Sequence, residues 1–249
     1  MPTTPEILET AAGATLATAL LAGGAIYAAI APTSRIFGSA LSAPNNPAKE
    51  RAQIALTFDD GPNPRWTPQL LDILAKHNVH ATFFLIGKYA STQRDIVRRT
   101  HEAGHLIGNH SWTHPNLART SRARTRQELI DTTNELEQIT GSRVRYFRPP
   151  FGYRRPATFN IARELGLIPV TWNAIANDWM GKPADYITAR CTRLINQNQS
   201  HGHATNLVLH DGSHLSLEAD RSCTISAADQ LINHFSATHR FVTLNEWQS

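Results

Sequence analysis

Two adjacent carboxylates, a pair of histidines four residues apart, an arginine and a further histidine stand at separate places in the chain. They are Asp59-Asp60, His110 with His114, Arg148 and His210. One carboxylate and two imidazoles form a ligand set that suits zinc or another divalent first-row ion and leaves positions open for water. A second carboxylate can take a proton from that water, and another histidine can donate one. These residue types therefore predict a metal-dependent hydrolase.

The aspartates and the arginine also have ordinary structural interpretations. Asp59 and Asp60 precede Gly61-Pro62, and aspartates are common where a turn opens. In an extended segment, however, neighbouring side chains point to opposite faces. The pair can then divide its tasks, with one carboxylate on a metal and one reaching water. Arg148, which precedes two prolines, is either a surface cation or the partner of a carboxylate.

The histidines are ambiguous in the same way. The spacing of His110 and His114 would place both imidazoles on one face of a helix. Pro115 disfavours a helical backbone at His114, so we expect the pair on a loop. His210 follows an apolar run and is either a capped strand end or a proton donor.

Short apolar runs alternate with helical periods from residue 51 onward, and this alternation must position the candidate residues. The predicted strands are 53–58, 81–86, 105–108, 145–148, 168–172, 206–210 and 240–244. The predicted helices are 67–77, 91–103, 124–140, 156–165, 183–196 and 225–235. Such alternation indicates an α/β fold with a parallel sheet, and about seven strands favour a distorted (β/α) barrel. The candidate residues follow strand ends, which meet at one mouth of such a barrel.

The composition is that of an ordinary globular protein. The 249 residues are 41% hydrophobic and 18% charged, with a net charge of +4, which excludes a disordered chain, a collagen-like repeat and a coiled coil. Two cysteines exclude a disulfide scaffold and a cysteine-based zinc module, and whether Cys191 and Cys223 pair stays open. A basic run of four arginines between residues 119 and 126 comes with no nucleic-acid-binding motif, so we expect no nucleic acid partner.

The first 49 residues differ from the rest. Residues 11–31 carry no charge and are long enough for a membrane-spanning helix. Glu6 and Glu9, rather than basic residues, precede this stretch, which favours a membrane anchor over a cleaved signal peptide. A buried or surface-lying Ala-rich helix is the alternative. Residues 32–49 have the composition of a linker, and 50–249 form the expected catalytic domain.

The candidate residues lie in five segments that follow one another in the order of a known family. The segments are Thr57-Phe58-Asp59-Asp60-Gly61-Pro62, His110-Ser111-Trp112-Thr113-His114, Arg148-Pro149-Pro150-Phe151-Gly152, Asp178-Trp179 and Leu207-Val208-Leu209-His210. Over about residues 50–249 the chain thereby resembles the polysaccharide deacetylase family, the NodB homology domain of carbohydrate esterase family 4. The first segment is the most specific. The resemblance implies a distorted (β/α) barrel, in agreement with the strand pattern.

The resemblance also implies an activity and a role for each matched residue. It implies removal of acetyl groups from an N-acetylated polysaccharide, peptidoglycan-like or chitin-like, by a water activated on a metal. The metal would be Zn²⁺, with Co²⁺, Ni²⁺ or Mn²⁺ as alternatives. Asp60, His110 and His114 would bind the metal. Asp59 would be the general base, oriented by Arg148, and His210 would be the general acid. The Phe151 N–H would donate a hydrogen bond to the oxyanion, while Val208 and Trp179 would line the pocket for the acetyl methyl group, with Trp179 closing one side.

One position departs from the family pattern. Relatives often carry a carboxylate four residues before Trp179, paired with the motif arginine, and this chain has Ile175 there. Arg148 would then lack its usual anchor unless Asp178 or another acid replaces it. A catalytically weak glycan-binding relative is therefore one alternative. An O-acetyl esterase or a non-sugar amidase with the same site is another.

The partners and the location are also expectations. The substrate would be an N-acetylated glycan, the chain would act as a monomer, and a membrane could be contacted through residues 11–31. The first cation after this stretch is Arg35, which by the positive-inside rule would leave the following residues in the cytoplasm. The habit of the resembled family favours a membrane-anchored or exported protein whose catalytic domain lies outside the cytoplasm.

Overall fold

The structure is a computed structural model that describes residues 23–24, 26–44 and 52–248. The strands are β1 Ala52–Gly61, β2 Thr82–Leu85, β3 Leu106–Asn109, β4 Tyr146–Phe147, β5 Ile168–Pro169, β6 Ala174–Ile175, β7 Thr205–His210 and β8 His239–Phe241. The helices are α2 Trp66–Lys76, α3 Gly87–Ala90, α4 Arg94–Glu102, α5 Arg122–Thr140, α6 Pro156–Glu164, α7 Ala184–Ser200 and α8 Ser222–Phe235. Three short 3-10 turns are η1 Pro150–Gly152, η2 Asp178–Met180 and η3 Leu244–Trp247.

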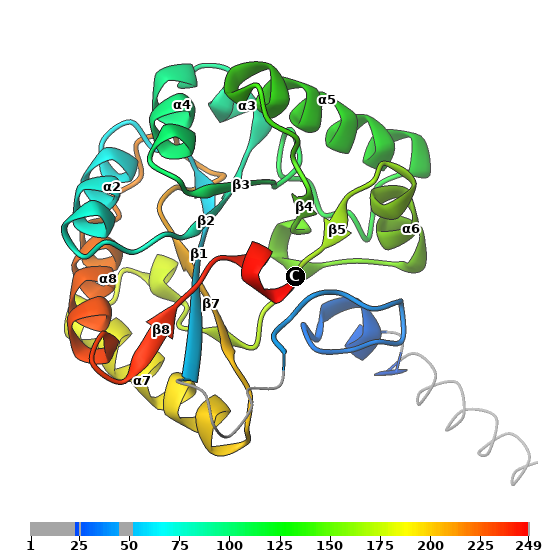
Figure 1. The fold of residues 1–249 in the computed structure, drawn as a ribbon. Helices are drawn as coiled ribbons and strands as arrows, with labels where there is room; N and C mark the ends of the chain where they lie inside the picture. The colour runs from blue at the N-terminus through cyan, green and yellow to red at the C-terminus, as the bar shows by residue number, and fades with distance from the viewer. Residues whose placement is uncertain (1–22, 25, 45–51, 249) are drawn as a thin grey trace, which may run out of the picture.

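The strands form one curled parallel sheet with the helices around its outside (Figure 1). The strand order is β5-β4-β3-β2-β1-β7-β6, and β8 pairs with the beginning of β1. The predicted α/β fold with parallel strands is confirmed. The sheet is, however, a curled half-barrel rather than a complete barrel, because the order ends at β5 on one side and at β6 on the other.

The opening of the half-barrel follows from the shortness of its edge strands. β4, β5 and β6 have only two residues each, too few for a continuous ladder. Leu41 forms a parallel bridge with Val170, and its carbonyl accepts a hydrogen bond from the Thr171 N–H at 3.0 Å. The Pro44 carbonyl accepts one from the Ala204 N–H at 3.1 Å. Backbone hydrogen bonds thus connect residues 41–44, in the predicted linker, with the end of β5 and the start of β7.

The alternation of side chains along β1 explains why this strand carries the site. Ile54, Leu56 and Phe58 are fully buried in the larger apolar cluster, together with the leucines of α2. Ala55 belongs to the smaller cluster inside the half-barrel. Because side chains on a strand alternate, Asp59 shares the inner face with Ala55 and points into the barrel.

Two elements differ from the sequence-based prediction. The predicted helix 91–103 is interrupted, because Gln93 has a non-helical backbone (φ −122°, ψ 40°) before α4 begins, and a separate short helix, α3, precedes it. Strand β6 was not predicted, since its two residues carry no periodicity that separates them from a loop.

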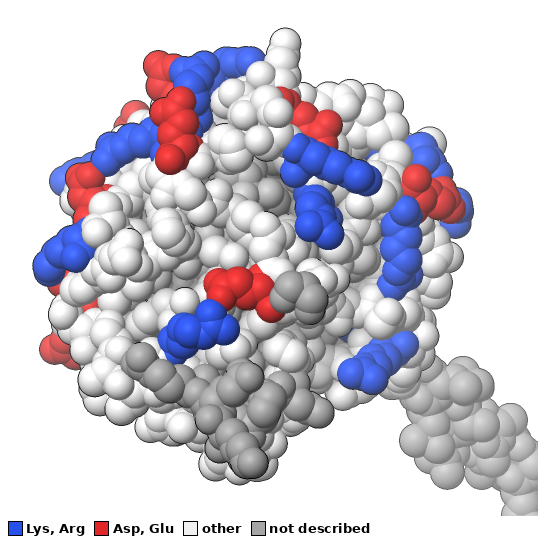
Figure 2. Space-filling model, in the orientation of Figure 1, with Lys and Arg blue, Asp and Glu red and all other residues white. Residues whose placement is uncertain are grey.

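Several charged side chains on the surface lie beside partners of opposite charge. In the predicted basic run, Arg124 pairs with Glu128 and Arg126 with Glu164. Acidic side chains likewise lie beside many of the cations on the face drawn in Figure 2. Some arginines of the basic run therefore form ion pairs within the fold.

Part of the predicted hydrophobic segment 11–31 lies outside the described residues, which begin at 23. Among the described helices, none is long and apolar enough to cross a membrane. The N-terminal residues that are described contact the domain. The Arg154 side chain is buried and donates hydrogen bonds to the carbonyls of Ala31 and Ser34. Cys191 and Cys223 are both free thiols.

Candidate active site

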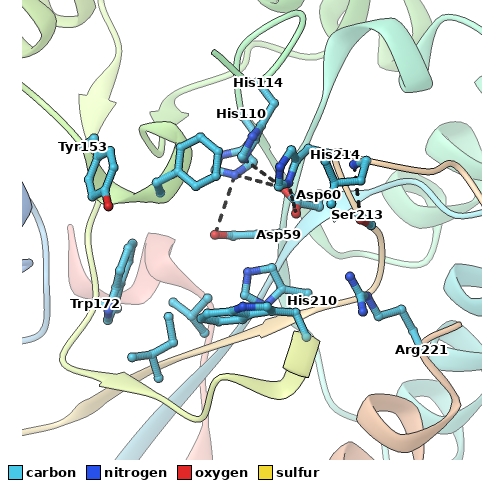
Figure 3. Close-up of a pocket in the computed structure, with 15 residues that line it drawn as sticks. Asp59, Asp60, His110, His114, Tyr153, Trp172, His210, Ser213, His214 and Arg221 are labelled. Atoms are coloured by element: carbon cyan, nitrogen blue, oxygen red, sulfur yellow. Dashed lines mark hydrogen bonds and ion pairs between the residues drawn. The ribbon is translucent and has the colours of Figure 1, made fainter. Parts of the chain in front are cut away.

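A pocket of about 340 Å³ opens at the carboxyl ends of the strands (Figure 3). Asp59 and Asp60 lie at the end of β1, His110 and His114 in the loop after β3, and His210 at the end of β7. All the residues predicted for the site line this pocket except Arg148, which lies fully buried behind Asp59. Segments far apart in the sequence thus supply one cavity, as the strand ends of a parallel sheet allow.

Asp60, His110 and His114 converge in a geometry that fits a metal ion. Each offers a ligand atom within 4.8 Å of the others, and all three residues are buried. Asp60 Oδ1 lies 3.4 Å from His110 Nε2 and 3.1 Å from His114 Nε2. This oxygen is buried without a hydrogen-bond partner among the described residues. Such an oxygen between two imidazole nitrogens is the donor set of a zinc-type site.

Hydrogen bonds hold the loop that carries the two histidines in place. His110 Nδ1 lies 2.8 Å from the Arg148 carbonyl oxygen, a contact that puts the proton on Nδ1 and directs the Nε2 lone pair at the site. The Ser111 hydroxyl accepts a hydrogen bond from the His114 N–H at 3.1 Å. Both imidazoles come from a loop, as Pro115 predicted.

Strained backbone gathers at this pocket. Asp60, Ser111, His114 and Phe151 have positive φ angles of 71°, 66°, 58° and 58°. Left-handed backbone is unfavourable for side chains of this kind and persists where surrounding structure enforces it. The arrangement of the site therefore costs stability that the rest of the fold must supply.

The protonation states agree with a cation-binding group. Burial lowers the pKa of His114 to about 4, so this imidazole is neutral and its lone pair is free. Burial alone would raise the pKa of Asp60, but the contacts with His110, His114 and His214 bring it well below its ordinary value. A charged carboxylate and a neutral imidazole are the forms that bind metals.

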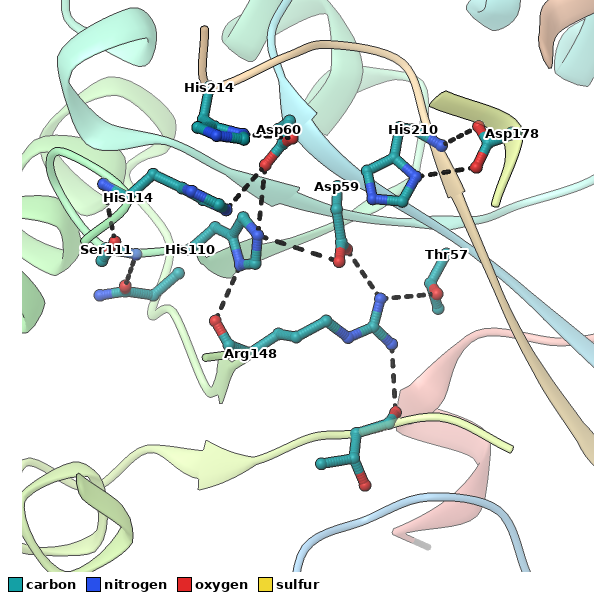
Figure 4. Close-up of polar contacts among 12 residues, drawn as sticks. Thr57, Asp59, Asp60, His110, Ser111, His114, Arg148, Asp178, His210 and His214 are labelled. Atoms are coloured by element: carbon teal, nitrogen blue, oxygen red, sulfur yellow. Dashed lines mark hydrogen bonds and ion pairs between the residues drawn. The ribbon is translucent and has the colours of Figure 1, made fainter. Parts of the chain in front are cut away.

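Asp59 is held by Arg148 (Figure 4). Arg148 Nη1 donates to Asp59 Oδ1 at 2.7 Å and to the Thr57 hydroxyl at 2.8 Å. The other end of the guanidinium, Nη2, donates to Asn206 Oδ1 at 3.2 Å and to the Thr171 carbonyl at 3.3 Å. Neutral oxygens therefore take the place of a second acid, and Asp59 is the only carboxylate paired with Arg148 among the described residues.

Asp178 binds His210 instead of Arg148. Its Oδ1 lies 2.9 Å from His210 Nδ1, and its Oδ2 accepts the His210 backbone N–H at 2.8 Å. The Thr224 hydroxyl donates to the same Oδ2 at 2.9 Å. Burial lowers the pKa of His210, but the Asp178 carboxylate more than offsets this effect, and the pKa rises to about 9. His210 is therefore protonated at neutral pH.

Apolar side chains form the remaining walls of the pocket. Val208 is 1% exposed on the floor, whereas Phe151 and Trp179 are 43% and 44% exposed at the rim. Ile175 also lines the pocket. Two other tryptophans, Trp66 and Trp112, are not among the residues that line it.

Sequence reasoning missed three residues of the site. It assigned no role to His214, left the partner of Asp178 open and did not consider Asn206. The aspartate next to Trp179 was a signal for a positioned acid, but its partner lies 32 residues away. His214 belongs to none of the matched segments, and only the course of the loop after β7 brings it to Asp60.

The coupling of His210 to Asp178 gives a prediction for Asp178→Asn. Without this negative charge, burial is opposed only by the smaller effects of Asp60 and Asp59, so the pKa of His210 should fall from about 9 toward its ordinary value of about 6.5 or below. The measurement is an NMR titration of the imidazole in metal-free protein. Thr224→Val, which removes a neutral partner of the same carboxylate, is the control and should leave His210 protonated at neutral pH. An unchanged titration in Asp178→Asn would contradict this assignment.

Comparisons with known proteins connect this geometry to a family. The polysaccharide deacetylase family model matches residues 46–170. A peptidoglycan-N-acetylglucosamine deacetylase of Bacillus cereus is 41% identical over 152 residues, which are 61% of this chain and 54% of that protein. A chitooligosaccharide deacetylase of Bradyrhizobium is 34% identical over 185 residues, 74% of this chain and 81% of that protein. The chain thus spans about half the length of the first of these relatives.

Solved structures agree with this relation. A peptidoglycan N-acetylglucosamine deacetylase in complex with a benzamide compound superposes with a TM-score of 0.72 at 35% identity, covering 83% of this chain and 91% of that one. An acetyl xylan esterase of Clostridium thermocellum, in complex with a cobalt ion, gives 0.69 at 33% identity, covering 78% and 89%. A family pseudoenzyme of Bacillus anthracis gives 0.70 at 27%, covering 79% and 65%. By sequence, fold and the residues gathered at the pocket, this chain belongs to the polysaccharide deacetylase family, carbohydrate esterase family 4.

Proposed function

We propose that the chain is a metal-dependent deacetylase that removes acetyl groups from an N-acetylated glycan, peptidoglycan-like or chitin-like, and releases acetate. One observation carries the proposal. The group Asp60, His110 and His114 shares a pocket with Asp59 and His210, and these two side chains pair with the buried Arg148 and Asp178. A protein that only binds glycans needs no such set.

The metal ligands are Asp60, His110 and His114, and the ion is Zn²⁺, with Co²⁺, Ni²⁺ or Mn²⁺ as alternatives. Three protein ligands leave positions open, as catalytic zinc sites require. A divalent ion held there would polarise the acetyl carbonyl and lower the pKa of a bound water to about 7. The side chains and backbone of this chain carry out the other steps of the proposed reaction.

Asp59 is the proposed general base. Its Oδ2 lies 3.9 Å from His110 Nε2, beside the ligand set, while Oδ1 is held by Arg148. The guanidinium favours the charged form of the carboxylate and fixes its direction. Asp59 takes a proton from the attacking water, whose oxygen adds to the acetyl carbonyl carbon.

The Phe151 N–H and His210 complete the proposed reaction. The N–H of Phe151, on the strained turn after β4, donates a hydrogen bond to the oxygen that becomes negative when water adds. His210, protonated because of Asp178, donates its proton to the sugar nitrogen as the carbon–nitrogen bond breaks. The products are a free amine and acetate. Val208 and Trp179 enclose the acetyl methyl group, and the exposed rings at the rim contact the sugar.

Two other functions have a specific observation in their favour. The similarity to an acetyl xylan esterase supports an O-acetyl esterase, because ester and amide hydrolysis can use the same groups. The similarity to a pseudoenzyme supports a catalytically weak glycan binder, as does Ile175. We favour the deacetylase, because the acid, the base and all three ligands are present. A non-sugar amidase remains the third alternative.

The proposed substrate also bears on location and assembly. Glycans of the peptidoglycan or chitin type lie outside the cytoplasm, so we propose an exported or membrane-anchored protein whose catalytic domain is extracytoplasmic. A membrane contact would use residues 11–31. All the proposed site residues belong to one chain, so a monomer suffices for the reaction.

The proposed function predicts acetate release from chito-oligosaccharides or peptidoglycan that stops with a chelator and returns with Zn²⁺. Acetyl-xylan is assayed in parallel, and Asp59→Asn should lower kcat by about 10²- to 10⁴-fold as the control. Release from acetyl-xylan alone would identify an esterase. Glycan binding that survives chelation, without cleavage of any substrate, would identify a binding protein.

Because Ile175 stands where relatives often carry an acid, we predict that the basicity of Asp59 is less well matched to the reaction. We therefore expect this enzyme to be slower than relatives with an acid at that position. Ile175→Asp would give Arg148 a second carboxylate and thereby make Asp59 a stronger base. We expect a faster reaction and a displaced acidic limb of the pH–rate profile. Ile175→Asn, similar in size to Asp but uncharged, is the matched control. Identical rates and profiles for wild type and Ile175→Asp would defeat the idea.

A further inference from the structure

His214 is a second partner of the metal ligands, although it belongs to none of the matched sequence segments. It lies in the loop between β7 and α8 and lines the pocket (Figures 3 and 4). Its Nδ1 is 3.6 Å from Asp60 Oδ2. Its ring stacks on that of His114, with centroids 4.4 Å apart and planes 19° apart. His214 therefore touches two of the three ligands at once.

The loop that carries His214 is held against β1. A Cβ atom on Gly212 would lie 2.1 Å from the Asp60 carbonyl oxygen, so only glycine permits this approach. The Tyr89 hydroxyl donates to the His214 carbonyl at 3.1 Å. Arg221 Nε donates to the Gly212 carbonyl at 2.7 Å. The Phe151 ring also packs against the imidazole, nearly at a right angle to it, with the two ring centroids 5.1 Å apart and the planes at 85°.

The two oxygens of Asp60 have different neighbours. Oδ1 faces Nε2 of His110 and of His114, at 3.4 and 3.1 Å. Oδ2 faces His214 Nδ1. A shift of a few tenths of an ångström brings Nδ1 and Oδ2 within hydrogen-bond distance. An N–H on His214 Nδ1 that points at Oδ2 occupies that oxygen and leaves Oδ1 to bind a cation.

We propose that His214 is a positioning residue that makes Asp60 a one-oxygen metal ligand. Partners of this kind orient metal ligands in proteins, and their loss commonly weakens metal binding. A carboxylate that binds through one oxygen keeps more coordination positions open for water and for the acetyl oxygen. The inference rests on the proposed metal site.

The donor and the ring can be separated by substitution. His214→Asn keeps an N–H donor near the position of Nδ1 and removes the ring. His214→Phe keeps a stacking ring and removes the donor. His201, an exposed residue at the end of α7, precedes β7 at the end opposite the pocket. His201→Phe and His201→Asn are therefore matched controls for the loss of an imidazole elsewhere.

The experiment measures metal affinity by competition with a chromophoric chelator and records the visible absorption spectrum of the Co²⁺-loaded protein. For His214→Phe we expect a Kd for Zn²⁺ about 10- to 100-fold higher. We also expect weaker visible Co²⁺ bands, because a two-oxygen carboxylate raises the coordination number. His214→Asn should keep the affinity and the spectrum near those of wild type, and both His201 variants should match wild type.

Two outcomes would overturn the inference. One is His214→Phe with the affinity and spectrum of wild type. The other is a His214→Asn variant that binds the metal ion as weakly as His214→Phe does. This would mean that the imidazole itself binds the ion or only packs there. A wild-type protein that binds no stoichiometric metal would instead defeat the proposed function, so the two failures are distinguishable.

Discussion

The burial of a charged carboxylate, Asp60, is the constraint on which the rest of the site depends. A buried charge without a partner is very costly, and Asp60 is only 6% exposed. Three imidazoles surround it, two on the loop after β3 and one on the loop after β7. Both loops must therefore approach the end of β1, and the left-handed backbone at Asp60 and His114 follows from that approach.

The other charged groups in the pocket each have a counter-charge of their own. Asp59 pairs with Arg148 and His210 with Asp178. This separation matters for the proposed reaction, in which the base Asp59 must stay charged and the acid His210 must stay protonated in the same small cavity. The pairing with Asp178 raises the pKa of His210, whereas at His114 burial outweighs the effect of the Asp60 carboxylate and lowers the pKa. Two histidines of one pocket thereby take opposite protonation states.

The features that the sequence predicted correctly are those set by patterns along consecutive residues. The apolar alternation before Asp59 gave β1, and Pro115 placed the histidine pair on a loop. The two-residue strands β5 and β6 lack a period, so neither the opening of the half-barrel nor β6 was foreseen. The ligand set was predicted from residue types and from family resemblance, and the structure brings its three residues together. The anchoring of Arg148 by Asn206 and the approach of His214 depend on contacts between distant segments, which no local pattern encodes.

The central claim is that Asp60, His110 and His114 hold one divalent ion. It is tested most directly by an anomalous difference map at the zinc edge, from crystals of the wild-type protein grown with Zn²⁺. The account predicts a single strong peak about 2.0–2.2 Å from a carboxylate oxygen of Asp60 and from Nε2 of both histidines. A map with no peak between these three side chains, or with the ion bound only elsewhere, would contradict it.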